Sequence, residues 1–185
     1  MHLPQLKRSV ACVGIALAAM TGTAAHAGIA SLNLDVNGAA SAGDLGEMFN
    51  EVRTWSIGAG VHIIGLSWNV SISTVGTSWL SEAGFDLAAA NGDGASLFPG
   101  LNDDFDGAES YSGSEDLVAG GTDFFLGQDG VLTGRFFESF YDASNGDPDA
   151  FWRGSVTVTY VPEPASYGLA ALGLLGIAAV RRRRA

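Results

Sequence analysis

The sequence predicts an all-β domain, an antiparallel β-sandwich of jelly-roll-like type, flanked by one apolar helix at each end of the chain. Three observations predict this fold. Apolar and polar residues alternate with a period of two in several segments, glycine and Asx-Gly pairs recur throughout, and no long stretch has helical periodicity. The length of 185 residues suits one domain. We therefore expect a body at residues 28–160 between terminal segments at 1–27 and 161–185.

Alternation is clearest in three segments, at residues 32–36, 64–72 and 155–160. Each predicts a strand with one dry and one wet face, as in an antiparallel sheet packed on a second sheet. Gln128-Asp129-Gly130 predicts a hairpin between residues 124–127 and 131–141, and residues 91–94 predict another turn. Roughly six to nine strands would fill such a sandwich, and residues 43–50 are expected to form a helical turn.

The body is strongly acidic. The whole chain has a formal net charge of −11, but residues 28–160 hold three arginines against 19 acids, which gives −16. This segment has no lysine and no cysteine. Nucleic-acid binding needs clustered Lys and Arg, so it is excluded, with no nucleic acid among the expected partners. A disulfide scaffold and a cysteine–zinc site are excluded as well.

Residues 1–27 have the three parts of a signal peptide. Lys7 and Arg8 provide a basic start, an apolar run covers residues 10–20, and Ala25-His26-Ala27 supplies the small residues before a cleavage point. Eleven apolar residues are too few to cross a hydrocarbon core of about 30 Å. We therefore expect a signal peptidase to cut between Ala27 and Gly28.

The C-terminal segment also has three parts. Pro162, Glu163 and Pro164 follow the last expected strand, and sixteen uncharged residues at 165–180 follow them. As a helix this run would rise about 24 Å. The run is followed by a cluster of four arginines: Arg181, Arg182, Arg183 and Arg184. By the positive-inside rule, this cluster places the C-terminus in the cytoplasm and the body outside.

This order of parts resembles the PEP-CTERM sorting signal of Gram-negative bacteria. The resemblance implies that Pro162-Glu163-Pro164 is a recognition motif for an exosortase, that residues 165–180 are a transient inner-membrane anchor, and that Arg181 to Arg184 are the membrane stop. It implies delivery of the body to the envelope or exterior. Members often occur in organisms that make exopolysaccharide and biofilm, so exopolysaccharide is an expected partner. A plain single-pass anchor is the alternative.

The body offers no motif for catalysis. His62 is the only histidine after residue 27, and it shares the apolar phase of residues 64–72, so we expect it to be packed and hydrogen-bonded. The sequence has no Gly-x-Ser-x-Gly elbow, no paired-histidine zinc motif and no phosphate-binding glycine loop before a helix. The pattern from Gly60 to Tyr160 is similar to jelly-roll sandwiches akin to the P-domain of secreted proteases, a resemblance that carries no catalytic residue.

Sugar is one ligand class that remains open. Tryptophan rings can stack on pyranose rings, but all four body tryptophans fall mainly on core phases: Trp55, Trp68, Trp79 and Trp152. The surface candidates are therefore aromatic residues of expected loops, such as Phe98, Phe105, Tyr111 and Phe151.

Calcium is the other ligand class. Asn102, Asp104 and Asp106 reproduce positions one, three and five of an EF-type loop, but Gly113 stands where the bidentate glutamate belongs. A second cluster of oxygen ligands contains Asp142, Asn145, Asp147 and Asp149. Solvated acidic turns are the alternative for both clusters.

These patterns together predict an exported, acidic, non-enzymatic sandwich with a structural or adhesive role in the envelope or extracellular matrix. A glycan- or calcium-binding module is the alternative, and a secreted hydrolase is the third hypothesis.

Overall fold

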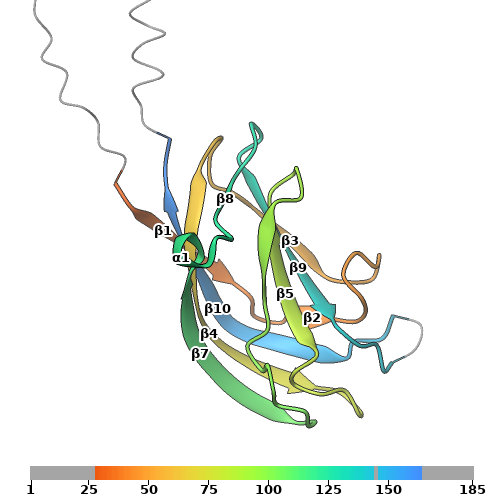
Figure 1. Ribbon diagram of the computed structural model, residues 1–185. Coiled ribbons are helices and arrows are strands. Elements are labelled where there is room, and N and C mark those ends of the chain that lie inside the picture. The colour runs from red at the N-terminus through yellow and green to blue at the C-terminus, as the bar shows by residue number, and fades with distance from the viewer. Residues whose placement is uncertain (1–27, 144–145, 164–185) are drawn as a thin grey trace, which may run out of the picture.

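The computed structural model of the protein describes residues 28–143 and 146–163. Two antiparallel sheets face each other (Figure 1). The first contains, in spatial order, β1 (Ala30–Asp35), β10 (Ala150–Val161), β4 (His62–Thr74) and β7 (Ala108–Asp116). The short strands β2 (Ala40–Ser41) and β8 (Phe124–Phe125) pair with β10 and β4, respectively. The second sheet contains β3 (Val52–Ser56), β9 (Val131–Glu138), β5 (Ala83–Ala88) and β6 (Gly94–Leu97).

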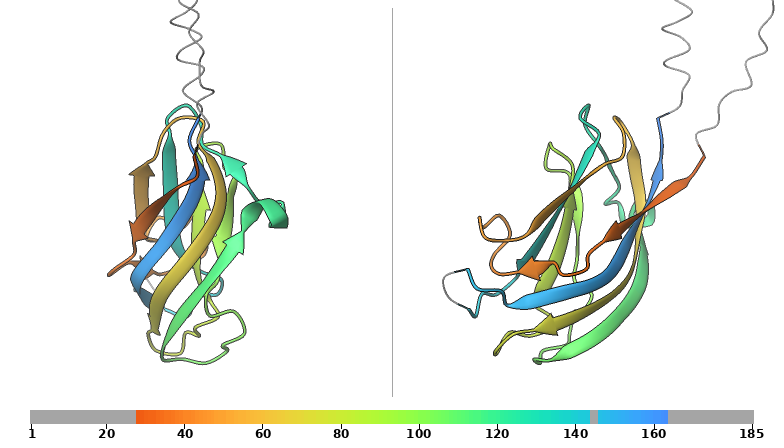
Figure 2. Two further views of the ribbon diagram at one scale, coloured as in Figure 1. Left: turned by 90° about the vertical axis from the view of Figure 1, so that its left-hand side faces the viewer. Right: turned by 180° about the vertical axis from the view of Figure 1, so that it is seen from behind.

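The chain passes back and forth between the two sheets (Figure 2). After β1 and β2 in the first sheet, the chain enters the second sheet as β3 and returns to the first as β4. β5 and β6 then lie in the second sheet, and β7 lies in the first. β9 then joins the second sheet and β10 enters the first sheet between β1 and β4. This winding is that of a jelly-roll-like sandwich, so the predicted all-β class is confirmed.

Aromatic and aliphatic side chains fill the space between the sheets. Trp152 from the first sheet and Phe85 and Phe136 from the second are fully buried. Phe85 stacks on Phe136 with 4.6 Å between ring centroids, and Trp152 meets Phe136 edge-on at 5.7 Å. Gly134 makes this packing possible, because a Cβ there would lie 2.7 Å from Trp55 and 2.8 Å from Phe85.

β4 follows its predicted phase along only part of its length. Thr159 pairs with Gly65 and Tyr160 with Ile63, so Ile64 is the extra residue of a β-bulge. The bulge reverses the alternation, and Ile63 rather than His62 or Ile64 is buried. The prediction that His62 shares the apolar phase is therefore wrong.

Two further local predictions are corrected. The Gln128–Gly130 turn forms, with the Gly130 amide donating to the Gly127 carbonyl at 3.0 Å, but it does not close a hairpin. β8 pairs with β4 and β9 lies in the other sheet, so the turn joins two layers. Residues 43–50 form turns rather than a helix, and the short helix is α1 (Leu117–Gly120), capped by the Asp116 side chain. The turn at residues 91–94 is confirmed between the paired strands β5 and β6.

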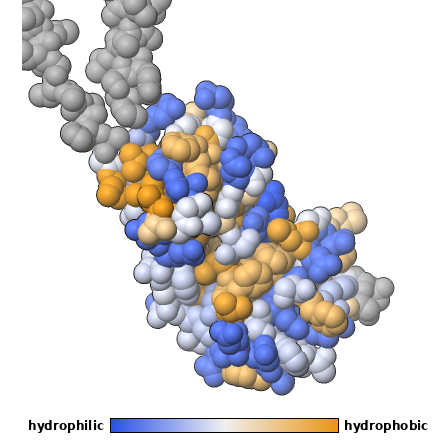
Figure 3. Space-filling model, in the orientation of Figure 1, coloured by the Kyte–Doolittle hydropathy of each residue, from blue (hydrophilic) through white to orange (hydrophobic). Residues whose placement is uncertain are grey.

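The first and last described residues lie at one end of the sandwich, since Ala30 pairs with Tyr160 (Figure 2). Ile29 and Val118 are exposed near this end, and Figure 3 shows an apolar area in the region of β1 and α1. Among the described residues no helix is long and apolar enough to cross a membrane. The predicted signal-peptide helix and the predicted transmembrane helix at 165–180 lie outside the described residues.

Candidate functional site

The opposite end of the sandwich carries an exposed tryptophan on a tightly fixed turn. Ser78 and Leu80 are fully buried, whereas Trp79 between them is 45% exposed. The Trp79 amide donates to Oε2 of Glu82 at 2.8 Å, and the Glu82 amide donates to the Trp79 carbonyl at 3.1 Å. Buried neighbours and these two bonds hold the indole outside the core. The prediction that Trp79 lies on a core phase is therefore wrong, because this segment is a turn rather than a strand.

The end of β9 lies against this turn. The Ser139 amide donates to the Glu82 carbonyl at 2.8 Å, which joins the segment after β9 to the segment before β5. Phe140, the next residue, is 61% exposed. One hollow of about 430 Å³ is lined by Trp79 and Phe140 together with Thr77, Glu82 and Asp142. This volume is within the range of small-molecule sites, about 300–1,000 Å³.

A second hollow adjoins the first. Its volume is about 320 Å³, and it shares Thr77 and Asp142 with the first. Asp147 and Asp149 also line it. The two hollows are therefore neighbours at this end of the sandwich, and together we call them the end groove.

Asp149 organises the loop beside the end groove. Its side chain is almost completely buried and accepts hydrogen bonds from the amides of Asp142, at 3.2 Å, and Ala143, at 2.9 Å. Burial raises the pKa of the Asp149 carboxyl, and these two amide donors oppose that rise. The role of Asp149 in the structure is to shape the loop.

Beneath the groove lies a buried carboxyl group on β9. Glu138 is fully buried, Oε1 accepts a hydrogen bond from the Ser41 hydroxyl, and Oε2 has no partner among the described residues. Burial raises the pKa of Glu138 to about 8, the Ser41 hydrogen bond lowers it, and the nearby Asp149, Glu82 and Asp142 raise it further. The group is therefore protonated at neutral pH.

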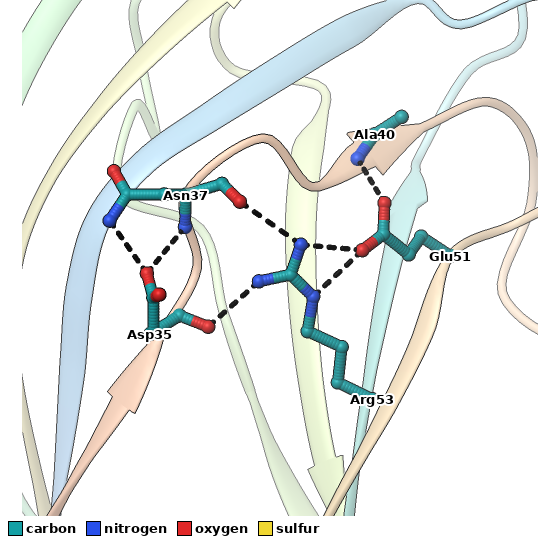
Figure 4. Close-up of polar contacts among 5 residues, drawn as sticks. All are labelled: Asp35, Asn37, Ala40, Glu51 and Arg53. Atoms are coloured by element: carbon teal, nitrogen blue, oxygen red, sulfur yellow. Dashed lines mark hydrogen bonds and ion pairs between the residues drawn. The ribbon is translucent and has the colours of Figure 1, made fainter.

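Arg53 fixes the segment that carries Ser41 (Figure 4). Its guanidinium donates to the carbonyls of Asp35, at 2.8 Å, and Asn37, at 3.1 Å, and to Oε1 of Glu51 at 2.7 Å. Oε2 of Glu51 accepts in turn from the Ala40 amide at 3.0 Å. This network joins the β1–β2 segment of the first sheet to β3 of the second.

The structure separates the six predicted calcium ligands. Asn102, Asp104 and Asp106 lie in the exposed segment between β6 and β7, where Asn102 has φ of 81° and Asp104 accepts from the Ser81 hydroxyl at 2.8 Å. Asp142, Asp147 and Asp149 line the second hollow of the end groove. Across the described residues no group of three or more His, Cys, Asp or Glu side chains is placed to hold a metal ion. Calcium binding stays a prediction.

The remaining tryptophans, His62 and Tyr111 are all at least partly buried. Trp152 is a core residue as predicted, and Trp55 and Trp68 pack partly buried against the core. His62 stacks on Phe125 with 4.1 Å between centroids, and its Nε2 lies 2.6 Å from the Asp123 carboxylate. The prediction of a hydrogen-bonded histidine is confirmed. Burial and the hydrogen bond to Asp103 raise the pKa of Tyr111, which is only partly exposed.

The predicted sorting motif begins where β10 ends. β10 runs to Val161, and Pro162, which cannot donate to a strand ladder, follows directly. The Glu163 carboxylate packs against Gly60 and occupies the space that a Cβ at residue 60 would need. Gly60 has φ of 64° and lies in the β3–β4 turn. Pro164 and Arg181 to Arg184 lie outside the described residues, as do Ala25 and Ala27, while Gly28 is the first described residue.

The molecule is thus an antiparallel β-sandwich whose last strand continues directly into its C-terminal tail. The model of the PEP-CTERM protein-sorting motif matches residues 161–184, so the chain carries this sorting motif. The motif indicates an exported protein that is sorted to the envelope and processed by an exosortase. The resemblance inferred from residues 161–185 is confirmed.

No curated protein matches the chain. Among solved structures, the chain is similar to the infectious bursal disease virus VP2 subviral particle, with 12% identity and a TM-score of 0.32 over 74% of this chain and 34% of that one. It is also similar to the Israel acute paralysis virus pentamer, with 7% identity and a TM-score of 0.25 over 75% and 88%. The chain spans about a third of the VP2 chain, and nothing about its function follows from either similarity.

Proposed function

We propose that this protein is an exported, non-enzymatic β-sandwich with a structural or adhesive role in the cell envelope or extracellular matrix. Signal peptidase removes residues 1–27, residues 165–180 hold the chain briefly in the inner membrane, and the exosortase then processes the tail. The observation that carries the proposal is the junction at Val161, which is both the last residue of β10 and the first residue of the matched sorting motif. The complete sandwich is therefore the part that the motif delivers.

The position of the end groove supports an adhesive role. β10 has 12 residues, and its first residue, Ala150, pairs with Thr74 and Ser41 near the groove. At about 3.3 Å per residue, the strand places the groove roughly 35 Å from the start of the motif. The groove thus lies at the opposite end of the sandwich from Val161, where a partner outside the cell can reach it.

The test is replacement of Pro162-Glu163-Pro164 by three alanines in the producing bacterium. We expect this variant to keep its tail and to stay in the inner-membrane fraction, since the motif is what the exosortase recognises. Intact-mass spectrometry of each fraction measures both ends of the mature chain. The control is Pro99→Ala, a proline substitution in the body that leaves the motif intact. Normal maturation of the triple-alanine variant would overturn the proposal.

A further inference from the structure

We propose that the end groove binds a pyranose glycan that carries free amino groups. This inference rests on the adhesive role proposed above and names the ligand of that role. It is argued from the two exposed rings of Trp79 and Phe140 and from the carboxylates that line the same hollow.

The aromatic rings provide the stacking surfaces. Trp79 and Phe140 are 45% and 61% exposed, although both rings would gain free energy by burial. Their exposure is fixed by the fold, since the Trp79 turn is anchored by buried Ser78 and Leu80 and joined to the β9 end by the bond from Ser139 to Glu82. Two preformed aromatic rings beside one hollow suit the apolar C–H faces of sugar rings.

The polar groups of the groove are mainly hydrogen-bond acceptors. Glu82 uses Oε2 for the Trp79 amide and the Ser78 hydroxyl, and within the described residues no hydrogen bond uses its Oε1. Asp142 is exposed and lines both hollows, and Thr77 lies beside it. Such groups accept hydrogen bonds from hydroxyl and ammonium groups of a ligand.

Charge selects among glycans. Glu82, Asp142 and Asp147 line the groove together with the buried Asp149, and no Lys, Arg or His is among its described lining residues. Anionic sugars are repelled by this surface. A protonated amine gains charge-assisted hydrogen bonds with the carboxylates and a cation–π contact with the indole. The two neighbouring hollows also offer room for more than one sugar ring.

The test is calorimetric titration of the full-length chain in detergent, so that binding is measured whether or not the tail is processed. The probe is a glucosamine pentamer at about pH 6. We expect at least tenfold tighter binding than for the N-acetylglucosamine pentamer. Trp79→Ala, Phe140→Ala and Asp142→Asn should each weaken binding about tenfold, while Trp79→Phe should retain most of it.

Phe151→Ala is the matched control, because Phe151 is 42% exposed and lies in a different hollow with Ser71 and Arg153. Binding by this variant should be unchanged. Equal binding of the acetylated pentamer would overturn the requirement for amines, and no binding of any saccharide would overturn the site. Tighter binding of pentalysine with the same dependence on Trp79 would overturn the glycan in favour of a basic polypeptide. Each outcome is independent of tail processing, so it is distinguishable from failure of the sorting proposal.

Discussion

The Ser41 hydroxyl donates a hydrogen bond to Oε1 of Glu138 inside the sandwich, while Oε2 of the same carboxyl group is buried without a partner among the described residues. This contact joins β2 to the end of β9, and the Glu138 amide adds a bond to the Gly43 carbonyl at 2.8 Å. A buried carboxyl group is tolerated there because it is neutral at neutral pH. Its ionisation is therefore coupled to the stability of this end of the molecule.

The first prediction concerns pH. The ordinary pKa of the group is 4.5, and the fold raises it to about 8. The folded state thus binds the proton more tightly, so stability falls as pH rises from 4.5 to about 8. The loss is at most about 5 kcal/mol. Glu138→Gln should remove this dependence, measured as urea unfolding at several pH values. The control is Glu109→Gln, because Glu109 is exposed. If the free energy of unfolding of Glu138→Gln changed with pH in parallel with that of the wild type, the prediction would be contradicted.

The second prediction concerns the contact between Gly60 and Glu163. A Cβ at residue 60 would overlap the Glu163 carboxylate, so Gly60→Ala should displace the Glu163 side chain from the β3–β4 turn. One weak contact of about 0.5–1 kcal/mol corresponds to roughly two- to fivefold faster processing by the exosortase. Pulse-chase labelling with intact-mass detection measures the rate. Gly38→Ala is the control, because Gly38 also has a positive φ of 74° but open space around it. Equal processing rates in the two variants would show that the contact has no role.

The third prediction concerns Arg53. Arg53→Ala should destabilise the fold by about 1–3 kcal/mol, since it removes the charged donor to Glu51 and to two backbone carbonyls. Arg53→Lys should recover only part of this loss, because an ammonium group lacks the planar fork. Urea unfolding at fixed pH measures both variants. Arg153→Ala, at an exposed position on β10, should change stability by less than about 0.5 kcal/mol. An equal effect of Arg53→Ala and Arg153→Ala would refute this account.

The fourth prediction concerns calcium. We expect calcium to raise the melting temperature, with oxygen ligands from Asp142 and Asp147 and from backbone carbonyls of the second hollow. Asp147→Ala should abolish the shift and Asp104→Ala should leave it, since Asp104 is in the other loop and accepts from Ser81. The same measurement with magnesium in place of calcium is the control, because any divalent cation screens the repulsion between the carboxylates of the acidic body. A melting curve that a chelator leaves unmoved would show that no calcium site exists.

Sequence reasoning predicts the fold class because the alternation in β1 and in most of β4 and β10 directly reflects burial between two sheets. It fails at Ile64, because a bulge depends on the register with β10, which is not a local property. It fails at Trp79, because buried neighbours rather than periodicity decide which side chains of a turn face outward. A signal for Glu138 exists, since this residue shares the phase of Leu132 and Phe136, but its ionisation depends on Ser41, far away in the sequence.

The place of β10 between β1 and β4 has a mechanical consequence. A load applied at the C-terminal tail runs along this strand, while its ladder hydrogen bonds lie perpendicular to the strand. The bonds on both edges are therefore strained together in shear and are not peeled apart one by one. A sandwich tethered at Val161 and bound at its far end would resist traction with the ladders on both edges of β10, which suits a component that must hold under flow.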